Sequence, residues 1–277
     1  MRVTVCGTRG STPAPGVEFL RYGGHTSCLA IAHDGAPPTL ILDAGTGIRR
    51  VSSLLGERPF EGAVLLGHLH WDHTQGLPFF IAGTLLGSSV DVYAPAQGST
   101  EAVLSRFMSP PHFPITPGEL RGSWRFDALE PGISNIAGFS VLALEIPHIG
   151  GRTFGFRVSD GRSTIAYLSD HCPTRLGPGP DGLGERHEAA LTLAADCDIL
   201  FHDAQYTDEE LPARGHFGHS SAGYAVALAE EASSRRLLLY HHDWMRTDHE
   251  IDAMVDRYKG AAVAVDGAFQ DMVIDVG

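Results

Sequence analysis

The stretch that decides the fold reads His68-Leu69-His70-Trp71-Asp72-His73, and it follows the apolar run Ala63–Leu66 and a break at Gly67. His68 and His70 alternate just past an expected strand, so both imidazoles can face one point. Asp72 and His73 follow where the chain turns, so they can face a second point nearby. Four ligand-type side chains packed this closely are what two neighbouring metal ions require. The stretch therefore predicts a two-metal site at the end of a strand.

Apolar runs that end in ligand-type residues recur along the chain. Ser163–Leu168 leads into Asp170, Asp198–Phe201 into His202-Asp203, and Arg236–Tyr240 into His241-His242. Short runs rich in Val, Ile and Leu and bounded by Gly or Asp are typical of buried strands. Further strands are expected at Val3–Cys6, Ser27–Ala32, Thr39–Leu42, Phe139–Ile146 and Thr153–Val158, and helices at Ser99–Phe107, Glu185–Ala195, Ser220–Ala232 and Asp248–Tyr258. This order predicts an α/β fold with two sheets between helical layers, as a single domain over residues 1–277.

The composition limits the partners of the chain. Its 277 residues carry 20 basic against 33 acidic side chains, which gives a formal net charge of −13. So acidic a surface repels polyanions, and we do not expect extended nucleic acid as a partner. One small phosphorylated ligand at a cationic metal centre stays compatible with this charge. The first residues lack the apolar core of a signal peptide, no apolar run could span a bilayer, and the four cysteines are dispersed. These features predict a cytoplasmic protein without a membrane partner.

The run from His68 to His73 resembles the HxHxDH signature of the metallo-β-lactamase superfamily. The chain is similar nearly end to end to the branch that contains tRNA 3′-processing endonucleases and cyclic-nucleotide phosphodiesterases. The similarity includes Gly7-Thr8-Arg9-Gly10-Ser11, Arg21-Tyr22-Gly23-Gly24 and Leu42-Asp43-Ala44-Gly45-Thr46-Gly47. The resemblance implies a metal-dependent hydrolase with the four-layer αββα sandwich fold and two metals at one edge, between the sheets.

The resemblance also implies the remaining metal ligands. The first metal would be held by His68, His70, His148 and Asp170, and the second by Asp72, His73, Asp170 and His241. An Asp at position 170, where true β-lactamases carry Cys, points away from β-lactam chemistry.

Two points about these ligands depend on the residues themselves. His241 and His242 are adjacent, and because side chains alternate along a strand end only one is expected to face the metals. The motif favours His241, and the reverse assignment stays open. A ligand set of nitrogen and oxygen suits two divalent ions, for which we expect zinc, with manganese or iron as alternatives.

Other motifs resemble catalytic segments of the branch. Gly218-His219-Ser220-Ser221 is similar to a motif whose His protonates the leaving oxygen, and His202-Asp203-Ala204 to one whose carboxylate orients that His. Asp203 stands where tRNA endonucleases typically have Glu, which weakens the tRNA interpretation. We also assign Asp72 a catalytic role beside its ligand role, and we expect Ser220 and His112 to contact substrate. His112 lies in the stiff segment Pro110-Pro111-His112-Phe113-Pro114, a loop that could overhang a pocket.

The resemblance and the acidic composition favour a phosphodiesterase that converts 3′,5′-cyclic nucleotides to nucleoside monophosphates. Two metals lower the pKa of a bridging water, which makes hydroxide available for in-line attack near neutral pH. The tRNA endonucleases of the branch generally carry a long basic arm between the third His ligand and the bridging Asp. Here the 21 residues from Ile149 to Ser169 are expected to form only a hairpin.

Alternative functions stay open at this point. A nuclease for RNA ends or tRNA could use a basic patch such as Arg49, Arg50, Arg121 and Arg125. A thioester or lactone hydrolase, or a non-catalytic metal-binding protein, could be built on the same fold. The expected partners are a small phosphodiester substrate and, by analogy with the branch, a second copy of the chain in a homodimer.

Overall fold

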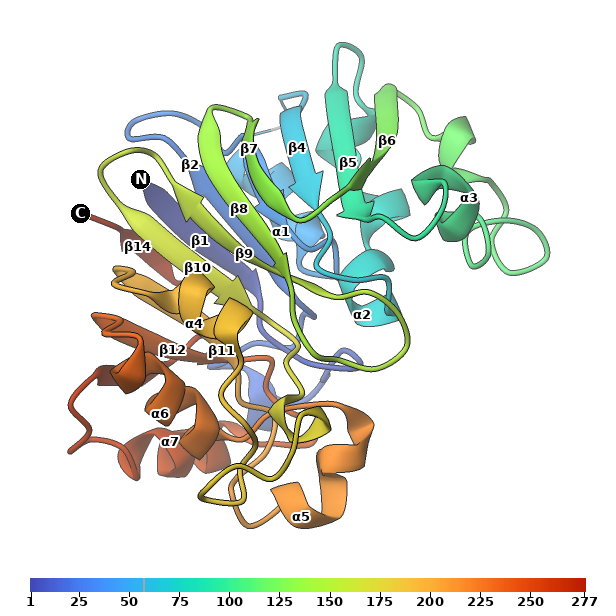
Figure 1. Ribbon diagram of the computed structural model, residues 1–277. Helices are drawn as coiled ribbons and strands as arrows, with labels where there is room; N and C mark the ends of the chain where they lie inside the picture. The colour runs from blue at the N-terminus through green and yellow to red at the C-terminus, as the bar shows by residue number, and fades with distance from the viewer. Residues whose placement is uncertain (57) are drawn as a thin grey trace.

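The computed structural model describes residues 1–56 and 58–277, and in these residues two seven-stranded β-sheets pack face to face (Figure 1). The strands of the first sheet are, in spatial order, β14 (Val273–Asp275), β1 (Arg2–Gly7), β2 (Cys28–Ala32), β3 (Leu40–Leu42), β4 (Glu61–Leu65), β5 (Ser89–Pro95) and β6 (Ser123–Leu129). Those of the second are β13 (Ala264–Gly267), β12 (Arg236–Tyr240), β11 (Ile199–Asp203), β10 (Thr164–Leu168), β9 (Phe154–Ser159), β8 (Phe139–Glu145) and β7 (Gly132–Ile136).

Both sheets combine antiparallel and parallel pairing. The strands from β14 to β3 and from β7 to β10 pair antiparallel, whereas those from β3 to β6 and from β10 to β13 pair parallel. Parallel neighbours need crossovers, and several of the crossovers contain the helices of the outer layers.

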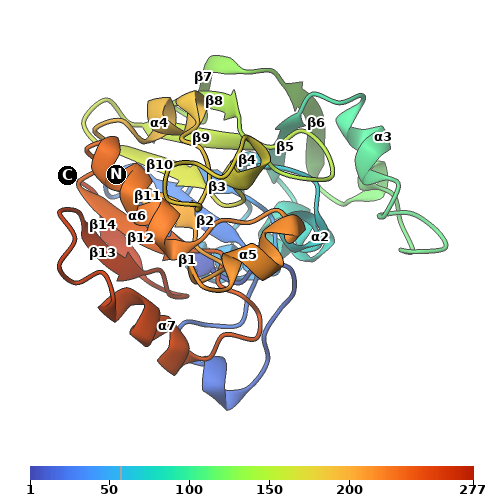
Figure 2. The same ribbon diagram turned by 60° about the horizontal axis from the view of Figure 1, so that its bottom comes forward.

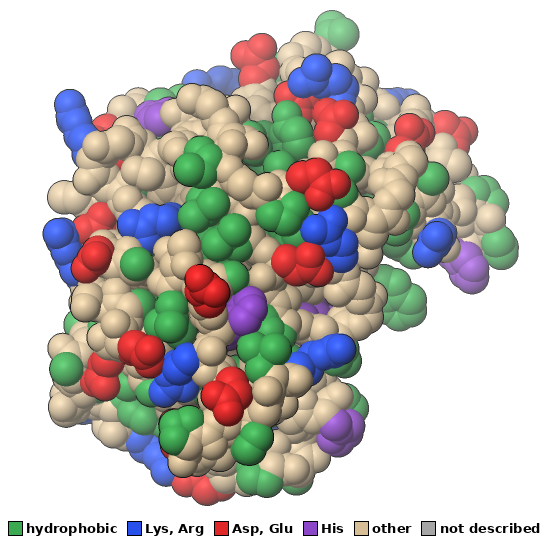
Figure 3. Space-filling model, viewed as in Figure 1, with side chains coloured by type: hydrophobic (Ala, Val, Ile, Leu, Met, Phe, Trp, Pro, Cys, Tyr) green, Lys and Arg blue, Asp and Glu red, His purple; other side chains and the backbone are tan. Residues whose placement is uncertain are grey.

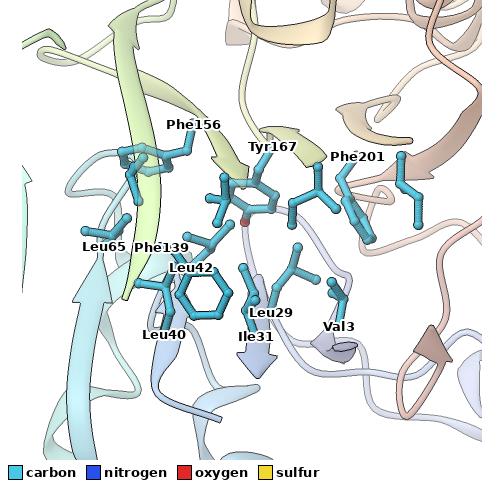
Figure 4. Packing of buried hydrophobic residues seen from close by; sticks show 14 of the residues in the cluster. Val3, Leu29, Ile31, Leu40, Leu42, Leu65, Phe139, Phe156, Tyr167 and Phe201 are labelled. Carbon is cyan, nitrogen blue, oxygen red and sulfur yellow. The ribbon is translucent and has the colours of Figure 1, made fainter. Parts of the chain in front are cut away.

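The central strands are apolar throughout because both of their faces are covered. In β3, Leu40 and Leu42 belong to the core between the sheets, and Ile41 packs into the outer layer. In β12, Leu238 and Tyr240 face the inner core and Leu237 faces the helices. Figure 4 shows the inner core, in which side chains from both sheets interdigitate. Continuous apolar runs, rather than alternating ones, follow from this two-sided burial.

Helices cover the outer face of each sheet, so the predicted α/β sandwich with four layers is confirmed (Figures 1 and 2). The α-helices are α1 (Ile48–Leu54), α2 (Trp71–Thr74), α3 (Thr100–Leu104), α4 (Glu188–Ala194), α5 (Leu211–Arg214), α6 (Ala222–Glu231) and α7 (Asp248–Asp256). The 3-10 helices are η1 (Val17–Phe19), η2 (Leu77–Phe79), η3 (Ile81–Thr84), η4 (Pro117–Glu119), η5 (Pro173–Arg175) and η6 (Gly215–Phe217).

The predicted helices are present but shorter than expected. The N-cap of α6 is Ser221, whose hydroxyl accepts from the backbone N–H of Tyr224. The helix therefore begins at Ala222, whereas the sequence predicts a start at Ser220. The N-cap of α7 is Thr247, which forms a capping box with Glu250. Among the described residues no helix is both long enough and apolar enough to cross a bilayer.

Two features of the outline matter for the site. Loops that follow the parallel strands of both sheets gather at one edge of the sandwich, where α2 and α5 lie (Figure 2). A lobe formed by α3 and the segment that follows it projects from the body of the molecule (Figures 1 and 2).

Candidate metal centre and active site

The segment after β4 positions the first four ligand-type side chains. The chain leaves the sheet at Gly67, whose N–H donates to Asp43 Oδ1 at 2.7 Å. His70 is extended, with φ −65° and ψ 155°, and it caps the single helical turn of α2. This change from strand to helix gives Asp72 and His73 a different backbone setting from His68 and His70.

The structure brings the predicted ligands together in two groups that meet at Asp170. One group contains His68, His70 and His148, and another contains Asp72, His73 and His241; within each, one potential ligand atom per residue lies within 4.8 Å of the others. A further group joins Asp170 to His68 and His73. Its Oδ1 lies 3.7 Å from His148 Nε2 and 3.5 Å from His241 Nε2, while its Oδ2 lies 3.0 Å from His73 Nε2. This carboxylate is placed where it could bridge two ions.

The hydrogen bonds of the outer nitrogen atoms aim two imidazoles at the cluster. His73 Nδ1 lies 2.7 Å from Asp43 Oδ2, and His148 Nδ1 lies 2.7 Å from the carbonyl oxygen of Gly218. Both partners are acceptors, so each Nδ1 carries the proton and each Nε2 presents a lone pair to the centre. An outer partner of this kind is the usual support of a metal-binding histidine.

The donors fit a pair of divalent cations. Both ring nitrogens of His68, Asp170 Oδ2 and His241 Nδ1 are buried and have no hydrogen-bond partner among the described residues. The Nε2 atoms of His73 and His241 lie 3.2 Å apart, a contact between two electron-rich atoms that a shared cation would relieve. Buried polar groups without partners are costly unless a ligand satisfies them.

Electrostatics lead to the same conclusion. Burial and the neighbouring His73 hold the pKa of His68 well below its ordinary value, which keeps the ring neutral and able to ligate. Burial alone would lower the pKa of His73, but the carboxylates of Asp170, Asp72 and Asp43 outweigh it and raise that pKa well above its ordinary value. The carboxylates around His73 stabilise positive charge, which suits a bound cation.

The adjacent histidines at the end of β12 have different surroundings. The ring of His241 lies in the cluster, with Nε2 3.1 Å from Asp72 Oδ2. His242 faces the other way, and its Nε2 lies 2.9 Å from the carbonyl oxygen of Ala268. His241 has a left-handed backbone with φ 57°, an uncommon conformation that is often found at functional sites. Gly10 makes room for this ring, since a Cβ there would lie 2.5 Å from its atoms.

His219 and Asp203 form a second unit beside the cluster. His219 Nδ1 lies 3.0 Å from Asp203 Oδ2 and 3.7 Å from Asp170 Oδ1. Asp203 is fully buried and accepts the N–H groups of His171 at 3.1 Å and Gln205 at 3.0 Å. The carboxylate is thus fixed, and it holds the proton of His219 on Nδ1, which leaves Nε2 free for another partner.

A cavity of about 490 Å³ opens over the cluster and is lined by His70, Asp72, Asp170 and His219. Aromatic side chains complete its wall, namely Trp71, Tyr206, Phe217 and Trp244. A cavity that joins titratable groups, candidate ligands and apolar walls is the usual form of a catalytic site.

The two predicted substrate contacts lie elsewhere. Ser220 is fully buried and donates to the carbonyl oxygen of Ser221 at 3.4 Å, so it does not line this cavity. His112 lines a separate, larger cavity of about 1160 Å³, which shares Leu69 and Trp71 with the first.

Asp43 and Ser11 also contact the ligand residues, although the sequence predicts no role for either residue. Asp43 is fully buried, and it accepts from His73 and from the hydroxyl of Tyr167 at 2.7 Å. The backbone N–H of Ser11 donates to Asp72 Oδ2 at 2.7 Å. Both residues belong to segments that carry the family resemblance, but no local pattern indicates that they reach the site.

Comparisons with known proteins agree with this geometry. The family model described as the Beta-lactamase superfamily domain matches residues 39–242. Ribonuclease Z of Salinibacter ruber is 26% identical over 269 residues, which cover 78% of this chain and 79% of that protein.

Solved structures share the fold. The human short-form tRNase Z has a TM-score of 0.69 and 21% identity, with 100% of each chain covered. The metallo-beta-lactamase fold protein YhfI of Bacillus subtilis has a TM-score of 0.74 and 18% identity, with 99% of each chain covered.

Proposed function

The chain belongs to the metallo-β-lactamase superfamily, in its ribonuclease Z-like and phosphodiesterase-like branch, and from this we propose that it hydrolyses phosphodiesters at the ends of RNA strands. That it is a metal-dependent hydrolase follows from the family. The RNA substrate is supported by the relatives named Ribonuclease Z, which align with most of the chain. The sequence alone favours cyclic nucleotides as the substrate and RNA ends as the alternative. The comparisons support the alternative better.

The observation that carries phosphodiester chemistry is the contact of 3.0 Å between His219 and Asp203 beside the ligand cluster. An alkoxide leaving group is strongly basic and needs a proton as its bond to phosphorus breaks. His219 can supply this proton from Nε2 while Asp203 stabilises the charged imidazole through Nδ1. Bound divalent ions, for which zinc is our proposal, would supply Lewis acidity and an activated water.

The remaining residues of the site hold the reacting groups in place. Asp72 and Asp170 would hold the cations together with the histidines of the cluster. Asp43 and Gly218 orient His73 and His148 through their Nδ1 protons. The aromatic side chains of the cavity wall offer apolar surface beside the reacting phosphate.

Small cyclic nucleotides are a second candidate because of the size of the site. The cavity of about 490 Å³ lies in the range of sites for small ligands. Between His148 and Asp170 the chain forms only the tight hairpin of β9 and β10, without an arm to clamp a large RNA. These features favour a small substrate or a short RNA end over a folded tRNA.

A hydrolysis panel with the zinc-loaded protein tests the proposal. It contains a single-stranded RNA hexamer, a tRNA precursor, 3′,5′- and 2′,3′-cyclic nucleotides, methyl p-nitrophenyl phosphate and a thioester. We expect cleavage of the hexamer and of methyl p-nitrophenyl phosphate. Activity on cyclic nucleotides without cleavage of the RNAs would favour the second candidate, and activity on the thioester alone would refute phosphodiester chemistry. The homodimer and the cytoplasmic location stay predictions, to be tested by light scattering and cell fractionation.

A further inference from the structure

The larger cavity adjoins the metal centre and has the shape of a groove. One wall comes from α1 and the segment of η2 and η3, and the other from the lobe of α3 and the loop after it. Leu69 and Trp71 line both cavities, so the groove lies directly beside the space over the cluster. Its volume of about 1160 Å³ exceeds that of a typical small-ligand site.

The charge of the groove is opposite to that of the chain. Arg49, Arg106 and His112 line it, and no Asp or Glu of the described chain does, although acidic residues outnumber basic ones in the sequence. Among the residues that the structure describes, neither arginine forms an ion pair or a side-chain hydrogen bond, whereas Arg50 pairs with Asp271 at 2.8 Å. Over the face drawn in Figure 3, basic and acidic side chains are interspersed. Two unpaired guanidinium groups at one cavity indicate an anionic ligand.

Aromatic side chains line the same cavity as these cations. Trp71 is 72% exposed and Phe79 is 52% exposed, so both present ring surface to a ligand. The rings of Phe79 and Phe113 meet edge to face across the groove, with centroids 6.0 Å apart. Exposed rings beside arginines form the surface on which the bases of a single strand stack while its phosphates are neutralised.

We propose that this groove, lined by Arg49, Trp71, Phe79, Arg106 and Phe113, binds a short single-stranded RNA segment of the substrate. The inference rests on the proposed function and adds where the strand lies. The groove shares no lining residue with the segment that carries His219. If His219 protonates the leaving oxygen, as proposed above, the groove takes the fragment that keeps the phosphate.

Other cationic surfaces fit a strand less well. The basic patch considered from the sequence is not formed as a unit, because Arg50 pairs with Asp271 and Arg125 pairs with Asp91 at 2.7 Å. Of its arginines, Arg49 alone lines the groove. A second copy of the chain could also cover this surface. The two lining residues shared with the cavity over the cluster favour the substrate strand.

The test compares a groove variant with a control of equal charge. Arg49→Ala/Arg106→Ala removes the two unpaired cations, whereas Arg125→Ala/Arg235→Ala removes two exposed arginines that pair with Asp91 and Asp198. Binding of a fluorescein-labelled RNA hexamer to the zinc-loaded protein is measured by anisotropy over a range of salt. Each lost phosphate contact lowers the salt slope by about 0.7, so the groove variant should lose about 1.4 and bind roughly 25-fold more weakly at 0.1 M salt. Phe79→Ala should weaken binding about 5-fold or more, and Phe79→Tyr should restore it.

Hydrolysis separates the groove from the chemistry. Methyl p-nitrophenyl phosphate is too small to reach both sites, so the groove variant should hydrolyse it at the wild-type rate while its KM for the hexamer rises. Equal binding by the groove and control variants would overturn the inference, as would a change of oligomeric state in the groove variant alone. If the wild type binds the hexamer through the groove but does not cleave it, the inference stands and the proposed function fails.

Discussion

Replacing Asp43 by Asn tests how the position of the second metal is supported. The buried carboxylate accepts from Gly67 N on Oδ1, and from His73 Nδ1, Tyr167 OH and Ser169 Oγ on Oδ2, at 2.7, 2.7, 2.7 and 3.3 Å. Asn keeps the shape of the side chain and tolerates the left-handed backbone, whose φ is 60°. The substitution therefore changes the hydrogen bonding and little else.

The magnitude follows from the donors around Oδ2. An amide nitrogen in this position faces the proton on His73 Nδ1, and the ring relieves the conflict by moving that proton to Nε2. Nε2 is the atom that faces the cluster, so a cation must displace the proton before it binds. Loss of such an outer partner weakens metal binding about 10- to 100-fold, or about 1.4 to 2.7 kcal/mol. In the reverse orientation the amide N–H of the introduced asparagine would face the N–H of Gly67. Neither donor can be moved away, so this orientation leaves both without an acceptor.

Zinc titration in competition with a chelator of known affinity measures this effect. In Asp43→Asn we expect one of two zinc constants to weaken by that factor, and turnover to recover at saturating zinc. Asp160→Asn is the matched control, since its carboxylate accepts the N–H groups of Arg162 and Ser163 at 2.9 and 2.8 Å at the opposite end of β10. Two wild-type zinc constants in Asp43→Asn would refute the reasoning.

Three further predictions follow from the site and the termini. His219→Ala should keep both zinc ions by elemental analysis and lose about 10²- to 10⁴-fold in RNA turnover, but much less with a p-nitrophenolate leaving group that needs no proton; equal losses on both would contradict a general acid. His241→Ala should bind one zinc fewer, whereas His242→Ala should keep the zinc content and lose about 1–3 kcal/mol of unfolding free energy; loss of zinc in the second variant would reverse the ligand assignment. Burial alone would raise the pKa of Asp160, but the N–H groups of Ser163 and Arg162 and the N-terminal ammonium lower it to about 2. Because the folded pKa is depressed, the stabilisation is present above about pH 4 and is lost as the pH falls toward 2; chemical denaturation should show a loss of at most about 2 kcal/mol in this window, absent in Asp160→Asn.

The sequence predicts the central strands well because two-sided burial makes them apolar along their length. Leu40–Leu42 and Arg236–Tyr240 are short, rich in Leu and bounded by turns. Strand β6 (Ser123–Leu129) is not predicted, because it is an edge strand whose side chains are mostly exposed or half-buried. Helix α1 (Ile48–Leu54) is not predicted either, since it follows a glycine without a side-chain cap and buries only Ile48 and Val51.

The site divides in the same way between local and distant contributions. The ligands from His68 to His73 lie within one segment, so their spacing in the sequence is enough to predict them. Asp43 reaches His73 across 30 positions, and Gly10 reaches His241 from the far end of the chain. Such contacts depend on the pairing of strands, which residue patterns do not encode locally. The same holds for Arg49 and Arg106, which line one cavity although they belong to segments far apart in the sequence.

The net charge of −13 predicts that the protein repels nucleic acid, but this prediction depends on where the charges lie. Many acidic side chains are neutralised by nearby arginines, as in the pairs of Arg125 with Asp91 and Arg257 with Glu209. At physiological salt, screening acts over about 8 Å, so a strand in the groove responds to Arg49 and Arg106 more than to the distant surface. A long duplex would extend beyond the groove and meet the rest of a chain whose formal net charge is −13. If the proposed RNA substrate is right, the net charge favours a short RNA end over a long duplex.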